Sequence, residues 1–144
     1  MFKKIILAFD GSPHARRALD AAVDLAQKYG AKLYIVSVVN IPDFAGTVDE
    51  VNGALEKGKE FFNKQLEEAQ KTASREGVEV ETRILAGHPF EAIARFVDSE
   101  GCDLIVVGSR GLGTVKRYLL GSVSEAIVRY AQCPVLVVKS RDRR

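Results

Sequence analysis

The sequence predicts an α/β fold, a doubly wound parallel sheet with helices on both faces. Five short runs rich in β-branched residues alternate with four helical patterns, and most of these runs are apolar throughout. Strands that are joined through helices pair in parallel, with right-handed crossovers. The chain has 144 residues, of which 47% are hydrophobic and 28% charged, so we expect residues 1–144 to form a single domain.

The first strand and helix are predicted from an apolar run and a helix cap. Lys4–Phe9 is continuously apolar after its first residue, which is typical of a strand buried on both faces. Ser12 and Pro13 follow a short turn and supply the N-cap and first-turn proline of a helix. Apolar residues then recur at helical spacing until Gly30, a residue suited to the end of that helix.

The middle of the chain predicts a buried strand, a long helix and an edge strand. Lys32–Val39 is a second β-branched run, and a loop follows at Asn40–Gly46. An apolar stripe, with Lys and Glu on the other faces, predicts a helix from about Val48 to Arg75. Val78–Leu85 alternates apolar with charged residues, as expected for a strand at an edge of the sheet.

The last third predicts two more helices and two more strands. Pro89 begins a helix, and Asp103–Val107 is a fourth buried strand. A glycine-bearing loop at Gly108–Leu120 leads into a helix at Ser122–Ala131, and Pro134–Val138 is the last strand. Ligands of doubly wound sheets bind beyond the carboxyl ends of the strands, where the winding reverses. The turns after the first, second and fourth strands are therefore the places to seek a site.

Composition excludes several classes of function. Lys and Arg number 21 against 19 Asp and Glu, and this net charge of +2 does not indicate a nucleic-acid-binding protein. No apolar run approaches the roughly 18 residues that span a bilayer, so we expect no membrane segment. Cys102 and Cys133 have no metal-binding spacing, which predicts two buried apolar thiols in a protein of the reducing cytoplasm.

The segment Gly108–Ser122 carries the strongest chemical signal. Glycines let backbone N–H groups approach an anion closely, and the helix that begins at Ser122 adds unpaired N–H groups and the positive end of its dipole. The hydroxyl groups of Ser122 and Ser124, with the nearby cations Arg110, Lys116 and Arg117, would complete a cradle for phosphates. A second interpretation remains open, because Ser122 and Glu125 match a capping box that needs no ligand.

Two common nucleotide-binding signatures are missing. The Walker pattern needs a lysine directly after its second conserved glycine, but Gly113 is followed by Thr114. The dinucleotide fingerprint belongs after the first strand, where the sequence offers only Asp10-Gly11-Ser12-Pro13. The two histidines, His14 and His88, lack a nucleophile elbow beside them, and we expect both to lie on the solvated surface.

The chain resembles the universal stress protein family, and specifically its ATP-binding branch. That branch carries a G-x2-G-x9-G-[S/T] pattern, which Gly108, Gly111, Gly121 and Ser122 match without a gap. The likeness runs from the opening strand through to Cys133–Val138. It implies a five-stranded sheet in the order 3-2-1-4-5 and, in many members, a homodimer formed through the last strand, here Pro134–Val138.

The resemblance also implies which residues would hold the nucleotide. Asp10, Ala8 and Phe9 would lie beside the adenosine, and Val38 would contact the adenine. Val107 would border the ribose and phosphates, and the glycines, serines and Val123 would hold the phosphate chain. The full set is Ala8, Phe9, Asp10, Val38, Val107, Gly108, Gly111, Gly121, Ser122, Val123 and Ser124. The ligand would be ATP, or else ADP or AMP, with Mg²⁺ or Mn²⁺ held by the phosphates and water because the sequence shows no carboxylate cluster.

Three functions stay open at this point. The first is a nucleotide-responsive dimeric regulator of a stress response, in which the loops 40–46 and 109–120 move. The second is a slow ATPase or a nucleotidyl transferase, although no arginine finger or catalytic Asp can be singled out beside the glycine loop. The third is a structural or signalling dimer that binds no nucleotide. The sequence favours the first, with little or no efficient catalysis.

Overall fold

The computed structural model describes residues 1–41, 46–110 and 120–139. Expectations about Gly111 and about the loops 40–46 and 109–120 therefore fall wholly or partly outside the described residues. The elements in chain order are β1 (Lys4–Ala8), α1 (Pro13–Tyr29), β2 (Lys32–Asn40), α2 (Val48–Arg75), β3 (Val80–Gly87), α3 (Pro89–Glu100), β4 (Leu104–Gly108), α4 (Ser122–Tyr130) and β5 (Val135–Val138).

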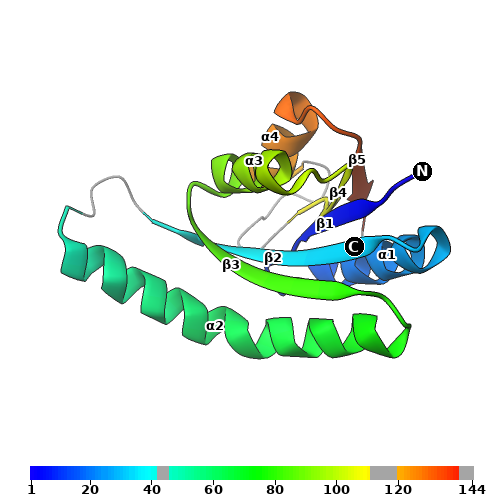
Figure 1. The fold of residues 1–144 in the computed structure, drawn as a ribbon. Helices are drawn as coiled ribbons and strands as arrows, with labels where there is room; N and C mark the ends of the chain where they lie inside the picture. The colour runs from blue at the N-terminus through cyan, green and yellow to red at the C-terminus, as the bar shows by residue number, and fades with distance from the viewer. Residues whose placement is uncertain (42–45, 111–119, 140–144) are drawn as a thin grey trace, which may run out of the picture.

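The five strands form one sheet in the order β3-β2-β1-β4-β5, and every neighbouring pair is parallel. The predicted fold class and strand order are both confirmed. The chain winds outward from β1 through β2 to β3, and then returns to the other side of β1 to form β4 and β5 (Figure 1). The winding therefore reverses between β1 and β4, where such sheets bind ligands.

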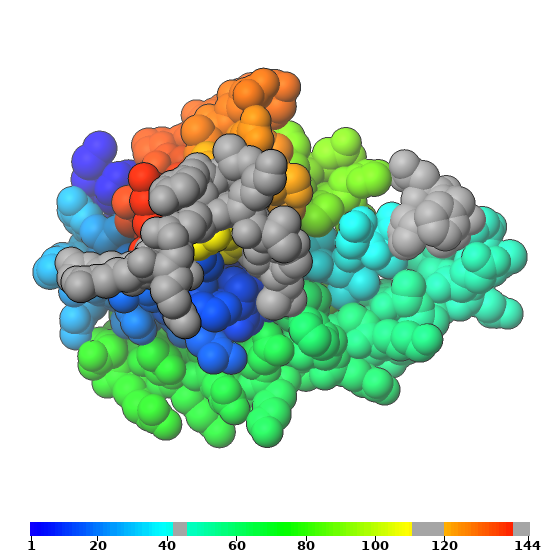
Figure 2. Space-filling view, turned by 180° about the vertical axis from the view of Figure 1, so that it is seen from behind, coloured from blue at the N-terminus to red at the C-terminus, as the bar shows by residue number. Residues whose placement is uncertain are grey.

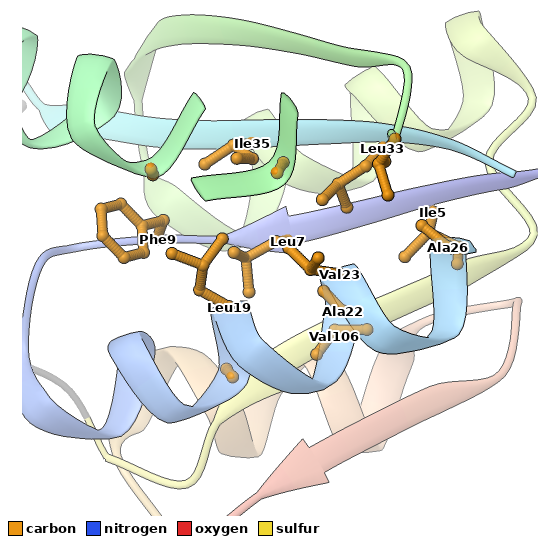
Figure 3. Close-up of a cluster of buried hydrophobic side chains, with 14 of the residues drawn as sticks. Ile5, Leu7, Phe9, Leu19, Ala22, Val23, Ala26, Leu33, Ile35 and Val106 are labelled. Atoms are coloured by element: carbon orange, nitrogen blue, oxygen red, sulfur yellow. The ribbon is translucent and has the colours of Figure 1, made fainter. Parts of the chain in front are cut away.

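Helices cover both faces of the sheet and enclose two separate cores. Helices α1 and α2 lie on one face and α3 and α4 on the other (Figure 1). Successive residues of β1 point to opposite faces, so Leu7 joins the α1–α2 core and Ile6 joins the α3–α4 core. In Figure 3, Leu7, Leu19 and Val23 meet between β1 and α1. This double burial explains why the central strands read as continuous apolar runs.

The predicted ends of α1 are confirmed. The Ser12 hydroxyl accepts a hydrogen bond from the Ala15 N–H at 3.2 Å, and Pro13 occupies the first turn. At the other end Gly30 adopts the left-handed conformation with φ 63° and donates its N–H to the last turn. The cap fixes the direction in which the chain leaves β1, and so fixes the turn at its carboxyl end.

Strand β3 lies at an edge, as predicted, but begins two residues later than expected. The alternating pattern starts at Val78, yet the Val78 N–H donates to the Ala73 carbonyl at 3.2 Å and closes the end of α2. Gly77 turns the chain there with φ 74°. The edge strand carries charge, because Glu81 pairs with Lys32 of β2 and with Arg83. The hydrogen bond from Lys32 lowers the pKa of the Glu81 carboxyl.

The two cysteines lie at the amino-terminal ends of β4 and β5. Cys102 is buried in the α3–α4 core and Cys133 is half-buried beside it, and both are free thiols. Burial raises the pKa of the Cys102 thiol to about 12 and also raises that of Cys133. Both therefore stay protonated at neutral pH and act as small apolar side chains. The predicted burial is confirmed for Cys102, whereas Cys133 is only half-buried.

Candidate functional site

A cavity of about 340 Å³ opens at the carboxyl edge of the sheet, where the winding reverses. Its walls come from the ends of β1, β2 and β4, from the first turns of α3 and α4, and from single residues of α1 and α2. Its volume lies at the lower end of the range for small-molecule sites. The turns after the first, second and fourth strands, which the sequence singled out, all contribute to it.

The structure brings the predicted binding residues together. Those found on the cavity wall are Ala8, Phe9, Asp10, Val38, Val107, Gly108, Gly121, Ser122, Val123 and Ser124. Gly111 lies outside the described residues. Residues separated by more than a hundred positions in sequence thus face one volume. Their contact with a ligand stays a prediction.

The amino terminus of α4 forms part of the cavity wall. Gly121 occupies the N-cap position, and no side chain of the described residues caps the helix. The Gly121 N–H donates to the Ser109 carbonyl at 2.8 Å, and the Gly121 carbonyl accepts the first helical bond, from Glu125, at 2.8 Å. The N–H groups of Ser122 and Val123 belong to the first turn, which has no acceptor within an α-helix.

The capping-box interpretation of Ser122 is wrong. Ser122 is the first residue of α4 rather than its cap, because the cap position belongs to Gly121. Its side chain is exposed at the cavity mouth. The Ser122 hydroxyl is thus placed where a ligand could meet it, and the helix terminus does not need it.

Ser124 holds α4 against the end of β4. Its buried hydroxyl donates to the Gly108 carbonyl at 2.6 Å. A hydroxyl has one hydrogen to donate, so a ligand in the cavity would find only the Ser124 backbone N–H as a donor. Together with the hydrogen bond between Gly121 and Ser109, this contact fixes the position of the amino terminus of α4 relative to β4.

Asp10 has a structural role and also faces the cavity. One carboxylate oxygen accepts the Ser12 N–H at 2.9 Å and so stabilises the turn between β1 and α1. The residue also lies on the cavity wall between the ends of β2 and β4. The turn role and the place beside the adenosine that the family resemblance implies for Asp10 are compatible, since a carboxylate accepts several hydrogen bonds.

His14 does not lie free on the surface, so the expectation for this residue is wrong. It is half-buried, and its Nδ1 lies 3.1 Å from the Ser109 hydroxyl. The first turn of α1 also approaches Gly108 so closely that an added Cβ would lie 2.9 Å from the His14 carbonyl carbon. The end of β4 is thereby anchored to α1 on one side and to α4 on the other. His88 is exposed at the start of α3, as expected.

Comparison with known proteins identifies the family. The model of the universal stress protein family matches residues 1–139. The chain belongs to this family. A putative universal stress protein of Staphylococcus haemolyticus is 43% identical over 145 residues, which cover 98% of this chain and 87% of the relative. A universal stress protein of Methanocaldococcus jannaschii is 37% identical over 141 residues, covering 96% of this chain and 83% of that one.

Solved universal stress proteins share the fold. The structure of UspA from Lactobacillus plantarum superposes with a TM-score of 0.84 at 25% identity, over 95% of this chain and 97% of that one. A universal stress protein crystallised in complex with cAMP superposes with a TM-score of 0.74 at 29% identity, over 95% and 97% of the two chains. That relative binds an adenine nucleotide.

Six wall residues of this universal stress protein were not predicted from its sequence. They are Ala15 of α1, Val36 and Asn40 of β2, Phe62 of α2, and Pro89 and Ile93 of α3. Val36 and Asn40 could have been found, because alternation along a strand places them on the same face as Val38. The other four reach the cavity only through the packing of helices on the sheet, which no local pattern reports.

The described part of this universal stress protein offers the cavity one acidic and one basic side chain, Asp10 and Arg110. Those residues include no group of three or more His, Cys, Asp or Glu that could hold a metal ion. No helix among them is long and apolar enough to cross a membrane. The cavity is thus equipped to bind an anion through hydrogen bonds and one guanidinium group.

Proposed function

We propose that this universal stress protein belongs to the ATP-binding branch of its family and acts as a nucleotide-responsive regulator. The observation that carries the proposal is the uncapped amino terminus of α4, which faces a cavity at the winding reversal of the sheet. An uncapped helix terminus at such a place suits a phosphate group. A related universal stress protein crystallised in complex with cAMP supports an adenine nucleotide as the ligand.

The phosphate chain would lie against α4. The N–H groups of Ser122 and Val123 supply donors, and the helix dipole adds partial positive charge. Arg110 also lines the cavity and follows Ser109, whose carbonyl accepts the Gly121 N–H, and its guanidinium group adds a full charge. Mg²⁺ or Mn²⁺ would be carried by the phosphate oxygens and water, because the cavity wall offers Asp10 as its one described carboxylate.

The nucleoside would lie against β1 and β2. Ala8 and Val38 supply apolar floor beside Phe9, and Ile93 of α3 faces them from the covering helix. Asp10 follows β1, which lies between β2, the strand of Val38, and β4, the strand that leads to Arg110, and this central position suits a ribose hydroxyl as its partner. In this proposal the apolar end of the cavity would take the base, the central carboxylate the ribose, and the cationic end the phosphates.

A slow ATPase or a nucleotidyl transferase is the alternative on the same cavity. Phosphoryl transfer needs a positioned base or water-orienting group as well as the phosphate cradle. Asp10 is the one carboxylate on the described wall, and it already accepts the Ser12 N–H. We therefore favour binding over efficient catalysis. An assay for ADP, AMP or pyrophosphate release separates the two.

Mass spectrometry of the small molecules released from purified protein tests the proposal. We expect an adenine nucleotide from the wild type and none from Gly121→Asp, because a carboxylate at the helix cap would repel phosphate. Gly53→Asp is the matched control, since an added Cβ there meets nothing within 4 Å and the position lies on α2 away from the cavity. A wild type that neither carries nor binds adenine nucleotides would leave the structural or signalling dimer as the remaining function.

We further propose that residues 1–144 act as one domain and pair through β5. All four residues of β5 are apolar and half-buried, and the strand is an edge of the sheet with β4 on its other side. An apolar edge strand is a template for a second copy. Binding of nucleotide near the start of α4 would reach this edge through β4, because the Ser109 N–H donates to the Val138 carbonyl at 2.9 Å.

A further inference from the structure

A second cavity, of about 600 Å³, lies between α3 and α4, the helices that cover the face of the sheet opposite α1 and α2 (Figure 1). Figure 2 shows the orange residues of α4 beside the yellow-green residues of α3 at the surface of the molecule. This α3–α4 cavity shares only Ile93 with the cavity at the carboxyl edge of the sheet. It is therefore a separate cavity, and its volume falls within the range of small-molecule sites.

The inner wall of the α3–α4 cavity is apolar. Ile105 of β4, Ile127 of α4 and Cys102 line it, and all three are buried side chains of the α3–α4 core. The raised pKa of the Cys102 thiol, which burial causes, keeps this side chain uncharged. A wall of this kind accepts a hydrocarbon or aromatic group, but it does not orient one. Orientation depends on the other wall residues, as in most small-molecule sites.

An aromatic pair on this wall joins the two helices. The ring centroids of Phe90 on α3 and Tyr130 on α4 lie 5.9 Å apart, and the ring planes are tilted by 57°. Both residues line the cavity. Aromatic rings attract one another in offset or edge-on contacts at centroid distances of about 4.5–7 Å, so a ring on a ligand would extend this pair.

Asp98 supplies the one charged side chain among the described residues that line the cavity. Its charge acts on another wall residue, Cys133: burial is the main cause that raises the pKa of this thiol, and the carboxylates of Asp103 and Asp98 raise it further. The Asp98 carboxylate is thus close enough to make the cavity electrically negative. The ion pairs within the described part of the chain use other carboxylates, which leaves that of Asp98 to a cationic ligand.

The carboxylate and the aromatic pair lie at separate places on the wall. Phe90 and Asp98 are eight residues apart on α3, which corresponds to about 12 Å along the helix axis. A ligand that meets both would carry a positive charge at one end and an aromatic ring at the other, joined by a short chain. A metal ion fits less well, because the described residues hold no group of three or more His, Cys, Asp or Glu that could bind one.

We propose that the α3–α4 cavity binds a small organic cation of the arylalkylamine class. The aromatic ring lies against Phe90 and Tyr130, and the ammonium group lies beside Asp98. The apolar inner wall contacts the chain between them. Nucleotide takes no part in this inference, which therefore holds or fails independently of the proposed function.

NMR titration with two probes of equal length tests the assignment. 4-Phenylbutylamine is protonated at neutral pH, and 4-phenylbutanol has the same ring and chain without the charge. In protein with labelled isoleucine methyl groups, both probes should shift the resonances of Ile105 and Ile127. The resonances of Ile5 and Ile35, which belong to the α1–α2 core, should stay unchanged. We expect the wild type to bind the amine about three- to fivefold more tightly than the alcohol, as for an exposed ion pair.

Asp98→Asn should weaken binding of the amine by the same factor and leave the alcohol unchanged, so that the preference disappears. The variant keeps the fold, because Asp98 is exposed. Glu91→Gln is the matched control, since Glu91 is an exposed carboxylate on the same helix that does not line the cavity. It should bind both probes as the wild type does.

Four outcomes overturn the assignment. The wild type could bind neither probe, or bind the two equally. Asp98→Asn could keep the preference for the amine, or Glu91→Gln could lose it to the same extent, which would make the effect one of net charge. Shifts that fall on Ile5 and Ile35 rather than on Ile105 and Ile127 would place the ligand outside this cavity and count against it equally.

Discussion

At Gly108 the chain has no room for a side chain. An added Cβ would lie 2.9 Å from the His14 carbonyl carbon and 3.0 Å from its oxygen, and both atoms belong to the backbone of α1. We expect Gly108→Ala to lower the free energy of unfolding by about 1–3 kcal/mol, because α1 must shift away from β4. Urea denaturation followed by circular dichroism measures the change.

Gly53 provides the comparison for that measurement. It lies within α2, and an added Cβ there meets nothing within 4 Å. Gly53→Ala should raise the free energy of unfolding by about 0.5–1 kcal/mol, because alanine loses less conformational freedom in a helix. Equal changes in the free energy of unfolding at the two positions would show that the close contact between Gly108 and α1 does not affect stability.

Single residues show both what sequence reasoning reaches and where it stops. Ser12 and Gly30 were assigned correctly because a helix cap depends on neighbours a few positions away. His14 was misjudged because its partner, Ser109, lies 95 positions along the chain. Phe62 was missed for the same reason, since only the packing of α2 on the sheet brings its ring to the cavity.

At the scale of elements, two serines in the first turn of α4 have different roles, although the sequence predicted that both hydroxyl groups would bind phosphate. Ser124 anchors the helix through its bond to Gly108, whereas Ser122 is exposed and caps nothing. Ser124→Ala should lower the free energy of unfolding by about 1–3 kcal/mol, because the buried Gly108 carbonyl loses its side-chain donor. Ser122→Ala should change it by less than about 0.5 kcal/mol, as at other exposed positions.

Nucleotide titration of the same pair completes this prediction. Ser122→Ala should weaken ATP binding through loss of a hydroxyl donor at the cavity mouth, while its stability stays that of the wild type. Ser124→Ala should weaken binding together with stability, since the helix terminus is no longer held toward the cavity. If Ser122→Ala destabilised the fold and left binding intact, a capping role would be restored to Ser122.

The order of elements was predictable because each carries a local periodicity, but their ends depend on competing hydrogen bonds. The alternating pattern extended β3 back to Val78, whose N–H is used instead to close α2. The capping-box pattern at Ser122 was overridden in a similar way. There Gly121 takes the cap position, because its N–H bonds to Ser109 at the end of β4.

At the scale of the whole molecule, the exposed edge at β5 predicts the oligomeric state. We expect sedimentation velocity to show a dimer for the wild type. Val137→Lys should give a monomer, because a charge on an edge strand opposes pairing with a second strand. Thr82→Lys, on the opposite edge strand β3, is the control and should remain dimeric.

Val137 also packs against the α3–α4 core, so the variant needs a check of its fold. Near-ultraviolet circular dichroism serves this purpose, and a monomer with native tertiary signal supports pairing through β5. A wild type that sediments as a monomer at every concentration contradicts it. So does a dimer that survives Val137→Lys.

The architecture of the molecule follows from its periodicities, whereas the strand order came from the family resemblance. Alternating strands and helices predicted parallel pairing, and the sheet is parallel throughout. Periodicity does not say on which side of β1 the fourth strand lies. That choice creates the cavity. The alternation of strands and helices was enough to predict a site at the turns after the first, second and fourth strands, whereas the family resemblance supplied the strand order that brings these turns together.

The two edge strands of the sheet differ in polarity, and this difference limits how many copies of the chain can associate. One edge strand is the apolar β5, and the other is β3, where Glu81 forms ion pairs with Lys32 and Arg83. In a two-fold symmetric dimer formed through β5, the apolar β5 strands of both copies are buried, and the edges that stay exposed are the charged β3 strands. Association would then stop at the dimer, because it leaves no apolar edge strand exposed to which further chains could add to form a fibril.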